Sequence, residues 1–164
     1  MPFFVFFVCF VVNRMGEAEQ RAKVIAEAKT WLGTPFRNCA DVKGAGVDCA
    51  MLLVRVFADT GIVPLFDPRP YPSQWYLHRD EERFLAVIGK LGSEVAREPL
   101  PGDVIVYRFG RCFAHGAVVI DAGHVLHAYS EVGEVSVSPL HEAMLSMLPD
   151  GRPRPRKIFD AWKK

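Results

Sequence analysis

Cys49 lies at the junction between a loop and an apolar run that predicts a helix. The loop contains Gly44 and Gly46, and the run from Ala50 to Ala58 carries a single charged side chain. The first turn of a helix presents unpaired backbone N–H groups and the positive end of the helix dipole, which stabilise a thiolate. The same N–H groups can hold the oxyanion of a tetrahedral intermediate. The position therefore indicates a nucleophile, provided that a base lies nearby.

Two of the five histidines are candidates for that base and for a group that orients it. His115 and His127 fall in two predicted strands that are joined by a tight turn at Gly123. Facing side chains of antiparallel neighbours lie about 4.5–5.5 Å apart, and the turn puts the two histidines level to within about one residue of register. We expect Cys49 as nucleophile, His115 as base and then acid, and His127 as the residue that orients His115. Pairing with His115 would lower the pKa of the thiol and populate thiolate near neutral pH.

These residues also have ordinary structural explanations. A single cysteine is often a small buried apolar residue, and a strand histidine is often a hydrogen-bonded core residue. A zinc site of Cys49, His115 and His127 is a further alternative, although the sequence indicates no fourth ligand. The four cysteines are irregularly spaced and form no C-x-x-C pair, which favours reduced thiols over a disulfide framework. Cys39 and Cys112 are interpreted as structural.

The composition indicates one folded domain. Of the 164 residues, 50% are hydrophobic and 24% are charged, with a formal net charge of +1. A chain of this length builds one core and is short for two. The near-neutral charge gives no reason to expect a nucleic-acid partner.

The first 14 residues differ from the rest of the chain. Residues 1–12 form an apolar run that is too short to span a bilayer as a helix and lacks the basic start of a secretory signal. We interpret residues 1–14 as a non-native or disordered extension before a natural start at Met15, with a marginal signal or anchor as the alternative. Residues 15–164 are then a single domain with no integral membrane association and a basic tail from about residue 150.

Helices are expected in the first half of the chain. Apolar residues recur at helical spacing over residues 17–32, and residues 50–60 are apolar on nearly every side, as in a buried helix. A third helix is expected over residues 73–91. Residues 36–47 form a loop, and four prolines make residues 62–72 an extended connector.

Strands are expected in the second half. Four β-rich stretches separated by short turns predict an antiparallel meander, at residues 103–109, 114–121, 124–130 and 135–137. Residues 141–148 predict a short helix, and the proline-rich tail predicts an extended, solvated segment that ends in an edge strand. Helices followed by strands is the order of an α+β domain.

Five short motifs follow one another along the chain: LGTPFR at 32–37, GAGVDC at 44–49, PGDVIV at 101–106, HGAVV at 115–119 and HA at 127–128. Their order, and the interval between the two histidines, resemble the NlpC/P60 family of papain-like cysteine peptidases over about residues 18–140. The resemblance implies a papain-like fold, with N-terminal helices packed on the meander. It also implies an endopeptidase of peptidoglycan stem peptides, often at the D-γ-glutamyl–diaminopimelate bond, with a Cys-His-His triad and no cofactor or metal.

The long loop before the cysteine and residues 71–78 look more like the phage-tail branch of this family, which includes members encoded in prophages and gene transfer agents. That likeness implies a protein made in the cytoplasm and incorporated into a phage-like tail or virion with other tail proteins. It would act in the periplasm of the target cell, where it opens the wall locally for DNA delivery. The alternative is a catalytically weak or inactive structural or assembly module of a tail tip.

Three more residues are candidates for substrate binding. Phe36 stands where the family usually has a tyrosine whose hydroxyl contacts the catalytic centre, so the ring is kept and that hydrogen bond is lost. Asp48 either caps the helix or binds a substrate amine, and Trp75 either lines the cleft or packs in the core. After the cysteine the family usually has serine or leucine and then glycine, whereas this chain has Ala50 and Met51. Met51 fills space that a glycine would leave open.

Overall fold

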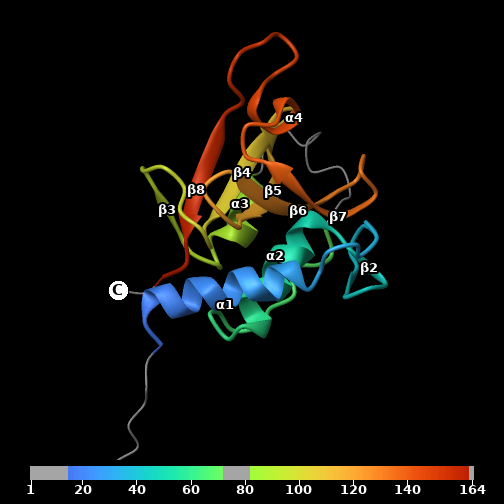
Figure 1. Ribbon diagram of the computed structural model, residues 1–164. Coiled ribbons are helices and arrows are strands. Elements are labelled where there is room, and N and C mark those ends of the chain that lie inside the picture. Colours follow the sequence, from blue (N-terminus) through green and yellow to red (C-terminus); the bar gives the residue numbers. More distant parts are fainter. Residues whose placement is uncertain (1–14, 72–81, 163–164) are drawn as a thin grey trace, which may run out of the picture.

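A computed structural model of the chain describes residues 15–71 and 82–162 (Figure 1). Its helices are α1 (Glu17–Lys29), α2 (Cys49–Asp59), α3 (Arg83–Ile88) and α4 (Ala143–Ser146). Its strands are β1 (Asp41–Val42), β2 (Gly46–Val47), β3 (Ser93–Val95), β4 (Val104–Phe109), β5 (Cys112–Val119), β6 (His124–Tyr129), β7 (Glu134–Pro139) and β8 (Arg156–Asp160). None of these helices is long and apolar enough to cross a membrane.

Six strands form one antiparallel sheet in the order β3-β8-β4-β5-β6-β7. The run from β4 to β7 is the meander that the sequence predicts. The helices α1 and α2 lie together beside this sheet (Figure 1). The predicted α+β class is therefore confirmed.

The C-terminal strand β8 and the strand β3 differ from the prediction. β8 is not an edge strand, because Ile158 lies opposite Ile105 of β4 on one side and Val95 of β3 on the other. Both Ile158 and the next residue, Phe159, are buried, and successive strand residues point to opposite faces, so β8 has the two covered faces of an interior strand. The outer position belongs to β3, where the sequence predicts no strand. Its side chains are mostly exposed and show no apolar alternation.

Two further predictions need correction. Residues 36–47 are not wholly a loop, because β1 and β2 pair there as a short antiparallel ladder. The third helix is limited to Arg83–Ile88 within the part of the chain that the structure describes, and residues 89–91 form a turn. Residues 73–81 of that predicted helix lie outside the described residues.

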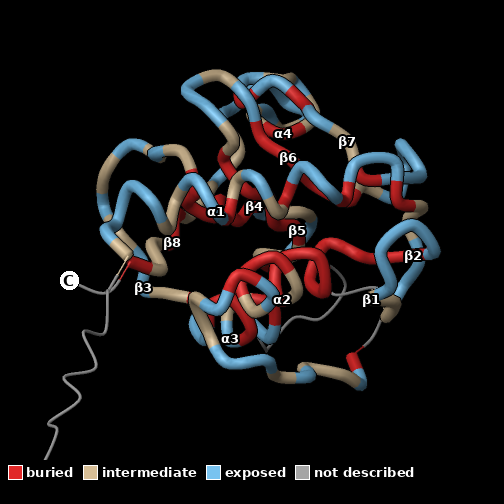
Figure 2. The backbone as a smooth tube through the Cα atoms, turned by 60° about the horizontal axis from the view of Figure 1, so that its bottom comes forward, coloured by how far each residue is buried: buried red, intermediate tan, exposed pale blue. Residues whose placement is uncertain are grey.

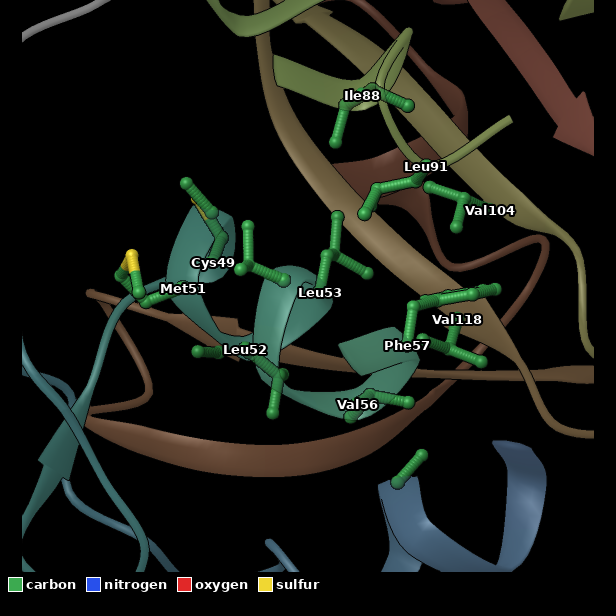
Figure 3. Close-up of a cluster of buried hydrophobic side chains, with 14 of the residues drawn as sticks. Cys49, Met51, Leu52, Leu53, Val56, Phe57, Ile88, Leu91, Val104 and Val118 are labelled. Atoms are coloured by element: carbon green, nitrogen blue, oxygen red, sulfur yellow. The ribbon is translucent and has the colours of Figure 1, made fainter. Parts of the chain in front are cut away.

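The helix α2 is the centre of the core (Figure 2). Eight of its eleven residues are buried, in keeping with its nearly uniform apolar sequence. Leu53 and Phe57 point from α2 toward the sheet, near Val118 of β5 (Figure 3). On its exposed side, Arg55 pairs with Asp59 one turn later. Burial of so many apolar side chains fixes the position of the helix start, and with it Cys49.

A buried carboxylate ties α1 to the sheet. Asp103, just before β4, accepts hydrogen bonds from Arg21 of α1 at 2.9 Å, from the Leu100 N–H at 2.8 Å and from Trp162 Nε1 at 3.3 Å. Arg97 donates to both of its oxygens. The paired arginines hold the pKa of Asp103 below its usual value although burial opposes this. The Pro-Gly-Asp motif therefore has a structural use in joining the two layers.

The sheet has a second, smaller core on its other face. β4 contributes alternate residues to the two faces, as its pleat requires. Val104 and Val106 belong to the cluster around α2, whereas Ile105 and Tyr107 pack in a separate cluster with Leu145 of α4. The helix α4 and the segment that leads to β8 therefore cover the face opposite α2.

Candidate active site

Cys49 is the first residue of α2, and Asp48 is its N-cap. The Asp48 carboxylate accepts hydrogen bonds from the Met51 N–H at 2.9 Å, from the Cys39 N–H at 2.6 Å and from the Tyr71 hydroxyl at 2.7 and 2.9 Å. These four contacts engage both carboxylate oxygens. Asp48 thus holds the helix start, the preceding loop and the connector in one arrangement around the thiol.

The segment before β1 is held against β2 and β7. The Phe36 N–H donates to the Gly133 carbonyl at 2.7 Å, and the Arg37 N–H donates to the Val47 carbonyl at 3.0 Å. A side chain at Gly46 would meet Arg37 Cδ at 2.8 Å, so the close passage of the two segments favours glycine there. These contacts place the Phe36 ring at the pocket that contains Cys49.

The two histidines meet across β5 and β6. A hydrogen bond of 2.7 Å joins His115 Nε2 and His127 Nδ1, and the ring centroids are 5.0 Å apart. The register pairs Val118 with Leu126, so its continuation sets His127 opposite Ala117, two residues from His115. The predicted offset of about one residue is therefore too small. Diagonal neighbours on one face still lie within reach of long side chains.

A fourth polar residue extends this pair. Ser138 of β7 lies with its Oγ 3.1 Å from His127 Nε2, and its side chain is buried. Both ring nitrogens of His127 are therefore hydrogen-bonded. His115 Nδ1 makes no hydrogen bond within the described residues. Ser138 could not be identified from the sequence, because nothing in the sequence gives the register of β7 against β6.

Aromatic rings surround the histidines. Tyr129 stacks on His127, with centroids 5.7 Å apart and an interplanar angle of 15°, and Phe109 meets the edge of His115 at 5.4 Å. Arg154 lies over the Phe109 ring, with its guanidinium carbon 4.1 Å from the ring centroid. The rings restrict the orientation of both imidazoles and limit their exposure to solvent.

A glycine brings β5 against the helices. A Cβ at Gly116 would lie 2.6 Å from Leu53 Cδ1 and 3.0 Å from Phe84 Cζ, which is closer than a side chain allows. The Gly116 N–H, together with those of Cys49 and Ala50, acts on the thiol sulfur and opposes the rise in its pKa. Glycine after His115 therefore lets the strand approach the start of α2 closely.

A cavity of about 350 Å³ joins these parts. Cys49 and His115 both line it, although only 9% and 5% of their surfaces are exposed. Its wall comes from the loop before α2, from β4 to β6 and from the turns at their ends, and it is formed by Phe36, Asn38, Asp48, Cys49, Phe109, Gly110, Ala114, His115, Ala128, Tyr129, Ser130 and Glu131. The predicted residue Trp75 lies outside the described residues.

The protonation states differ from the expectation of a resting thiolate. Burial, and next the Asp48 carboxylate, raise the pKa of the Cys49 thiol to about 12. Burial lowers the pKa of His115 well below its usual value, with His127 and Arg154 as further causes, and burial lowers the pKa of His127 to about 4. At neutral pH the free site therefore holds a neutral thiol and neutral imidazoles. The Cys49 sulfur makes a long contact of 4.0 Å to the Ala114 carbonyl.

The structure gives no support to a zinc site. In residues 15–71 and 82–162, no three His, Cys, Asp or Glu side chains are placed to hold a metal ion. The structure shows no disulfide at the three cysteines in this part of the chain, Cys39, Cys49 and Cys112. The arrangement instead supplies a protected thiol, an imidazole nitrogen and helix-start N–H groups beside one cavity. Acyl transfer through sulfur uses this set.

Comparison with known proteins gives one family and several related structures. The NlpC/P60 family profile matches residues 33–148. The fold is similar to the NlpC/P60 domain of the peptidoglycan hydrolase SagA, with a TM-score of 0.59 and 16% identity over 85% of this chain and 98% of that one. It is also similar to the peptidoglycan hydrolase RipB from Mycobacterium tuberculosis, with a TM-score of 0.57 and 21% identity over 92% of this chain and 70% of that one.

A third similar structure is NlpC2 from Trichomonas vaginalis, with a TM-score of 0.65 and 16% identity over 92% of this chain. The chain spans 49% of that protein. No curated protein sequence matches the chain significantly. At these identities the structural likeness shows the fold alone, with helices beside an antiparallel sheet, as in this chain.

Proposed function

The chain belongs to the NlpC/P60 family, and from this premise we propose that it is a cysteine peptidase that hydrolyses the stem peptides of peptidoglycan. The observation that carries the proposal is the shared cavity of Cys49 and His115, with His127 hydrogen-bonded behind His115. Two proteins of similar fold, SagA and RipB, are named peptidoglycan hydrolases, which supports this class of substrate.

In the acylation step, His115 acts as a general base. Its Nε2 is bonded to His127, so Nδ1 is the nitrogen that takes the thiol proton. The Cys49 sulfur attacks the peptide carbonyl carbon, a C–S bond forms, and the carbonyl π electrons move to oxygen. The N–H groups of Cys49 and Ala50, at the positive end of α2, hold that oxyanion. Because both partners are neutral at rest, proton transfer accompanies attack and does not precede it.

Collapse of the intermediate breaks the C–N bond. His115 returns its proton to the leaving nitrogen, and a thioester remains on Cys49. Water then attacks the thioester while His115 takes one of its protons. The C–S bond breaks, the new carboxylic acid leaves, and the proton returns to sulfur.

The proton positions follow from the hydrogen-bond chain. If Nδ1 of His115 is to accept a proton, its Nε2 carries hydrogen and donates to His127 Nδ1. His127 then carries its own hydrogen at Nε2 and donates to Ser138 Oγ. In this arrangement Ser138 Oγ is the terminal acceptor of the chain.

We propose the bond between D-γ-glutamate and diaminopimelate as the one that is cut, on the strength of the sequence resemblance. The test is a mass spectrum of fragments released from purified sacculi by the wild type, by Cys49→Ala and by Cys112→Ala. We expect release by the wild type and by Cys112→Ala, and a loss of at least about 10³-fold for Cys49→Ala, since triad nucleophiles carry effects of this size. No release by the folded wild-type protein would refute the peptidase proposal.

The proposed setting is a phage-like tail, made in the cytoplasm and delivered to the periplasm of the target cell. Its support is the sequence likeness of the loop before Cys49 and of residues 71–78 to tail-associated members. In particles that carry Cys49→Ala, we expect normal assembly with loss of local wall opening.

The second candidate is a weak or inactive module that serves tail assembly. The raised pKa of Cys49 and the missing hydroxyl at Phe36 favour it. It predicts that Cys49→Ala particles remain fully infectious, whereas deletion of the domain prevents assembly. The same two particle preparations therefore separate the two functions.

A further inference from the structure

We propose that a second cavity, on the sheet face opposite α2, binds an oxyanion, a phosphate or a carboxylate carried by a small ligand. The cavity has a volume of about 520 Å³ and, within residues 15–71 and 82–162, shares no lining residue with the one at Cys49. Its wall comes from β4, from α4 and from the chain that enters β8, and it is formed by Tyr107, Leu140, His141, Ala143, Ser146, Met147, Pro153, Arg154 and Arg156.

Backbone contacts join two segments of the wall of this cavity. Met147 and Pro153 form an isolated antiparallel bridge, and the Arg154 N–H donates to the Ser146 carbonyl at 2.7 Å. These bonds hold α4 against the segment before β8, at one end of the sheet (Figure 1). The cavity is therefore a fixed part of the fold.

Tyr107 supplies a buried donor without an acceptor. Its side chain is 1% exposed, it lines the cavity, and its hydroxyl has no hydrogen-bond partner within the described part of the chain. Burial raises its pKa to about 12, so the oxygen keeps its proton and can donate it to an acceptor. An unpaired buried hydroxyl is costly and uncommon in a native fold.

Arg154 supplies a cation without an acid. Its two terminal nitrogens donate to the Arg108 and Met147 carbonyls at 2.7 and 2.9 Å, and its buried Nε has no partner among the described residues. Within the described residues, Arg154 forms no ion pair with a carboxylate. Since a guanidinium is always charged and binds oxyanions through several N–H groups, Arg154 lacks the partner for which its geometry is suited.

Arg156 adds a second positive charge at the same wall. Its carboxylate partner, Glu98, lies 3.2 Å away with a side chain that is 87% exposed, so solvent weakens that pair. Among the described residues, no aspartate or glutamate lines the cavity. Two arginines, an unpaired hydroxyl and no acid together select a negatively charged ligand.

The rest of the wall indicates that the ligand is larger than a bare ion. Leu140, Ala143 and Met147 add apolar surface, and the volume lies in the range of small-molecule sites, about 300–1,000 Å³. The site would therefore take an oxyanion at the arginines and a small organic body beside α4.

The site lies behind the catalytic cavity and not in it. Arg154 of this cavity stacks on the Phe109 ring, and the same ring contacts His115 of the catalytic cavity. Binding can therefore be measured without turnover, so failure of this proposal and failure of the peptidase proposal are separate results.

The test is calorimetric titration with inorganic phosphate, glycerol 3-phosphate and acetate at constant ionic strength, with amide NMR to locate the site. We expect saturable binding of at least one of the three, with shifts at Tyr107 and in residues 146–156. Comparison of the three ligands identifies the preferred oxyanion. No saturable binding of any of them would overturn the proposal, as would shifts confined to other surfaces.

Variants make the assignment specific. Tyr107→Phe removes a hydroxyl that has no partner among the described residues, so the protein should stay folded while binding weakens by about threefold or more. Arg156→Gln should weaken binding about tenfold. The matched control is Arg152→Gln, which removes the same charge from a 75% exposed side chain paired with Asp150 outside the cavity. Equal weakening by Arg152→Gln and Arg156→Gln would show diffuse attraction and refute the site.

Discussion

His115 and His127 are joined ring to ring at 2.7 Å although the strand register sets them two residues apart. The diagonal arrangement leaves His127 Nε2 directed to the next strand, where Ser138 Oγ lies 3.1 Å away. Three adjacent strands thus contribute one polar residue each to a single hydrogen-bond chain. The chain ends at His115 Nδ1, the nitrogen assigned to the thiol proton.

The first prediction concerns the end of this chain. His127→Ala should reduce kcat/KM on a stem peptide by about 10²-fold or more, since positioned acid–base groups contribute about 10²–10⁴-fold. Ser138→Ala should reduce kcat by about tenfold with little change in KM, because partners behind the reacting group act through orientation. Ser138→Thr keeps the hydroxyl and should restore most of the rate. Steady-state kinetics of the variants measure this.

The control for that series is Ser136→Ala, on the same strand and opposite His127 in the ladder. Its kinetics should match those of the wild type. A Ser138→Ala enzyme with unchanged kcat, or a Ser136→Ala enzyme that is equally slow, would contradict the assigned tautomer chain.

The second prediction concerns stability as a function of pH. In the folded protein the pKa of His127 is about 4, whereas an unfolded histidine titrates near 6.5. As the pH falls from 6.5 toward 4, the unfolded chain therefore binds the proton first, and the free energy of unfolding decreases. The contribution is fully present above pH 6.5, and about 3 kcal/mol is lost by pH 4. His115, with its pKa also lowered, acts in the same direction.

Urea denaturation between pH 4 and pH 7.5 measures this dependence. His127→Asn should flatten the slope over that range. His124→Asn is the control, because His124 lies at the surface with a side chain that is 49% exposed. Equal slopes in the wild type and His127→Asn would show that the buried ring is not the source.

The third prediction concerns the charge beside the nucleophile. The Asp48 carboxylate raises the pKa of Cys49, so Asp48→Asn should lower it and increase the rate of iodoacetamide alkylation at pH 8. A fall of one pKa unit gives about a tenfold rise in thiolate far below the pKa. The variant also loses hydrogen bonds to the loop and connector, at about 1–2 kcal/mol of stability. An unchanged or slower alkylation rate would contradict the electrostatic role.

The matched control is Asp59→Asn, at the other end of α2, where the carboxylate pairs with Arg55 at the surface. It removes the same charge from the same helix. Its alkylation rate should equal that of the wild type.

Much of the site could be predicted from the sequence because its parts are local. A cysteine before an apolar helix and two histidines on strands joined by a short turn have their relative positions set by helix and strand geometry. Cys49, His115 and His127 accordingly fall in the predicted elements. Their burial is a property of the whole fold, which is why the sequence predicted a low pKa for Cys49 and the structure raises it.

The parts that were missed depend on distant contacts. β8 acquires its neighbours, β3 and β4, from segments about 50–67 residues away, and nothing local in Arg156–Asp160 reveals that both faces are covered. Ser138 depends on the register between β6 and β7. β3 is too short and too exposed to show a pattern.

The fourth prediction concerns the close approach of β5 to the helices. Gly116→Ala should lower the free energy of unfolding by about 1–3 kcal/mol, since the new Cβ meets Leu53 at 2.6 Å and Phe84 at 3.0 Å. Gly123→Ala is the control, because the nearest atom lies at 3.7 Å, and its change should stay within about 0.5 kcal/mol. Denaturant titration of both variants measures the difference.

A double variant locates the strain. Leu53→Ala should cost less stability in the Gly116→Ala protein than in the wild type, because truncation of Leu53 makes room for the added methyl group. Additive effects of the two substitutions would place the strain elsewhere.

The position of β8 also bears on the order in which the domain is made. A ribosome delivers β3 and β4 first, but they pair with β8 and not with each other. Until residues 156–160 emerge, β4 has an open edge, and β3 lacks the strand that it pairs with in the described part of the chain. The meander that carries the histidines can form earlier, but its sheet is completed by the strand synthesised after all the others. The six-stranded sheet is therefore complete only after Arg156–Asp160 have been synthesised.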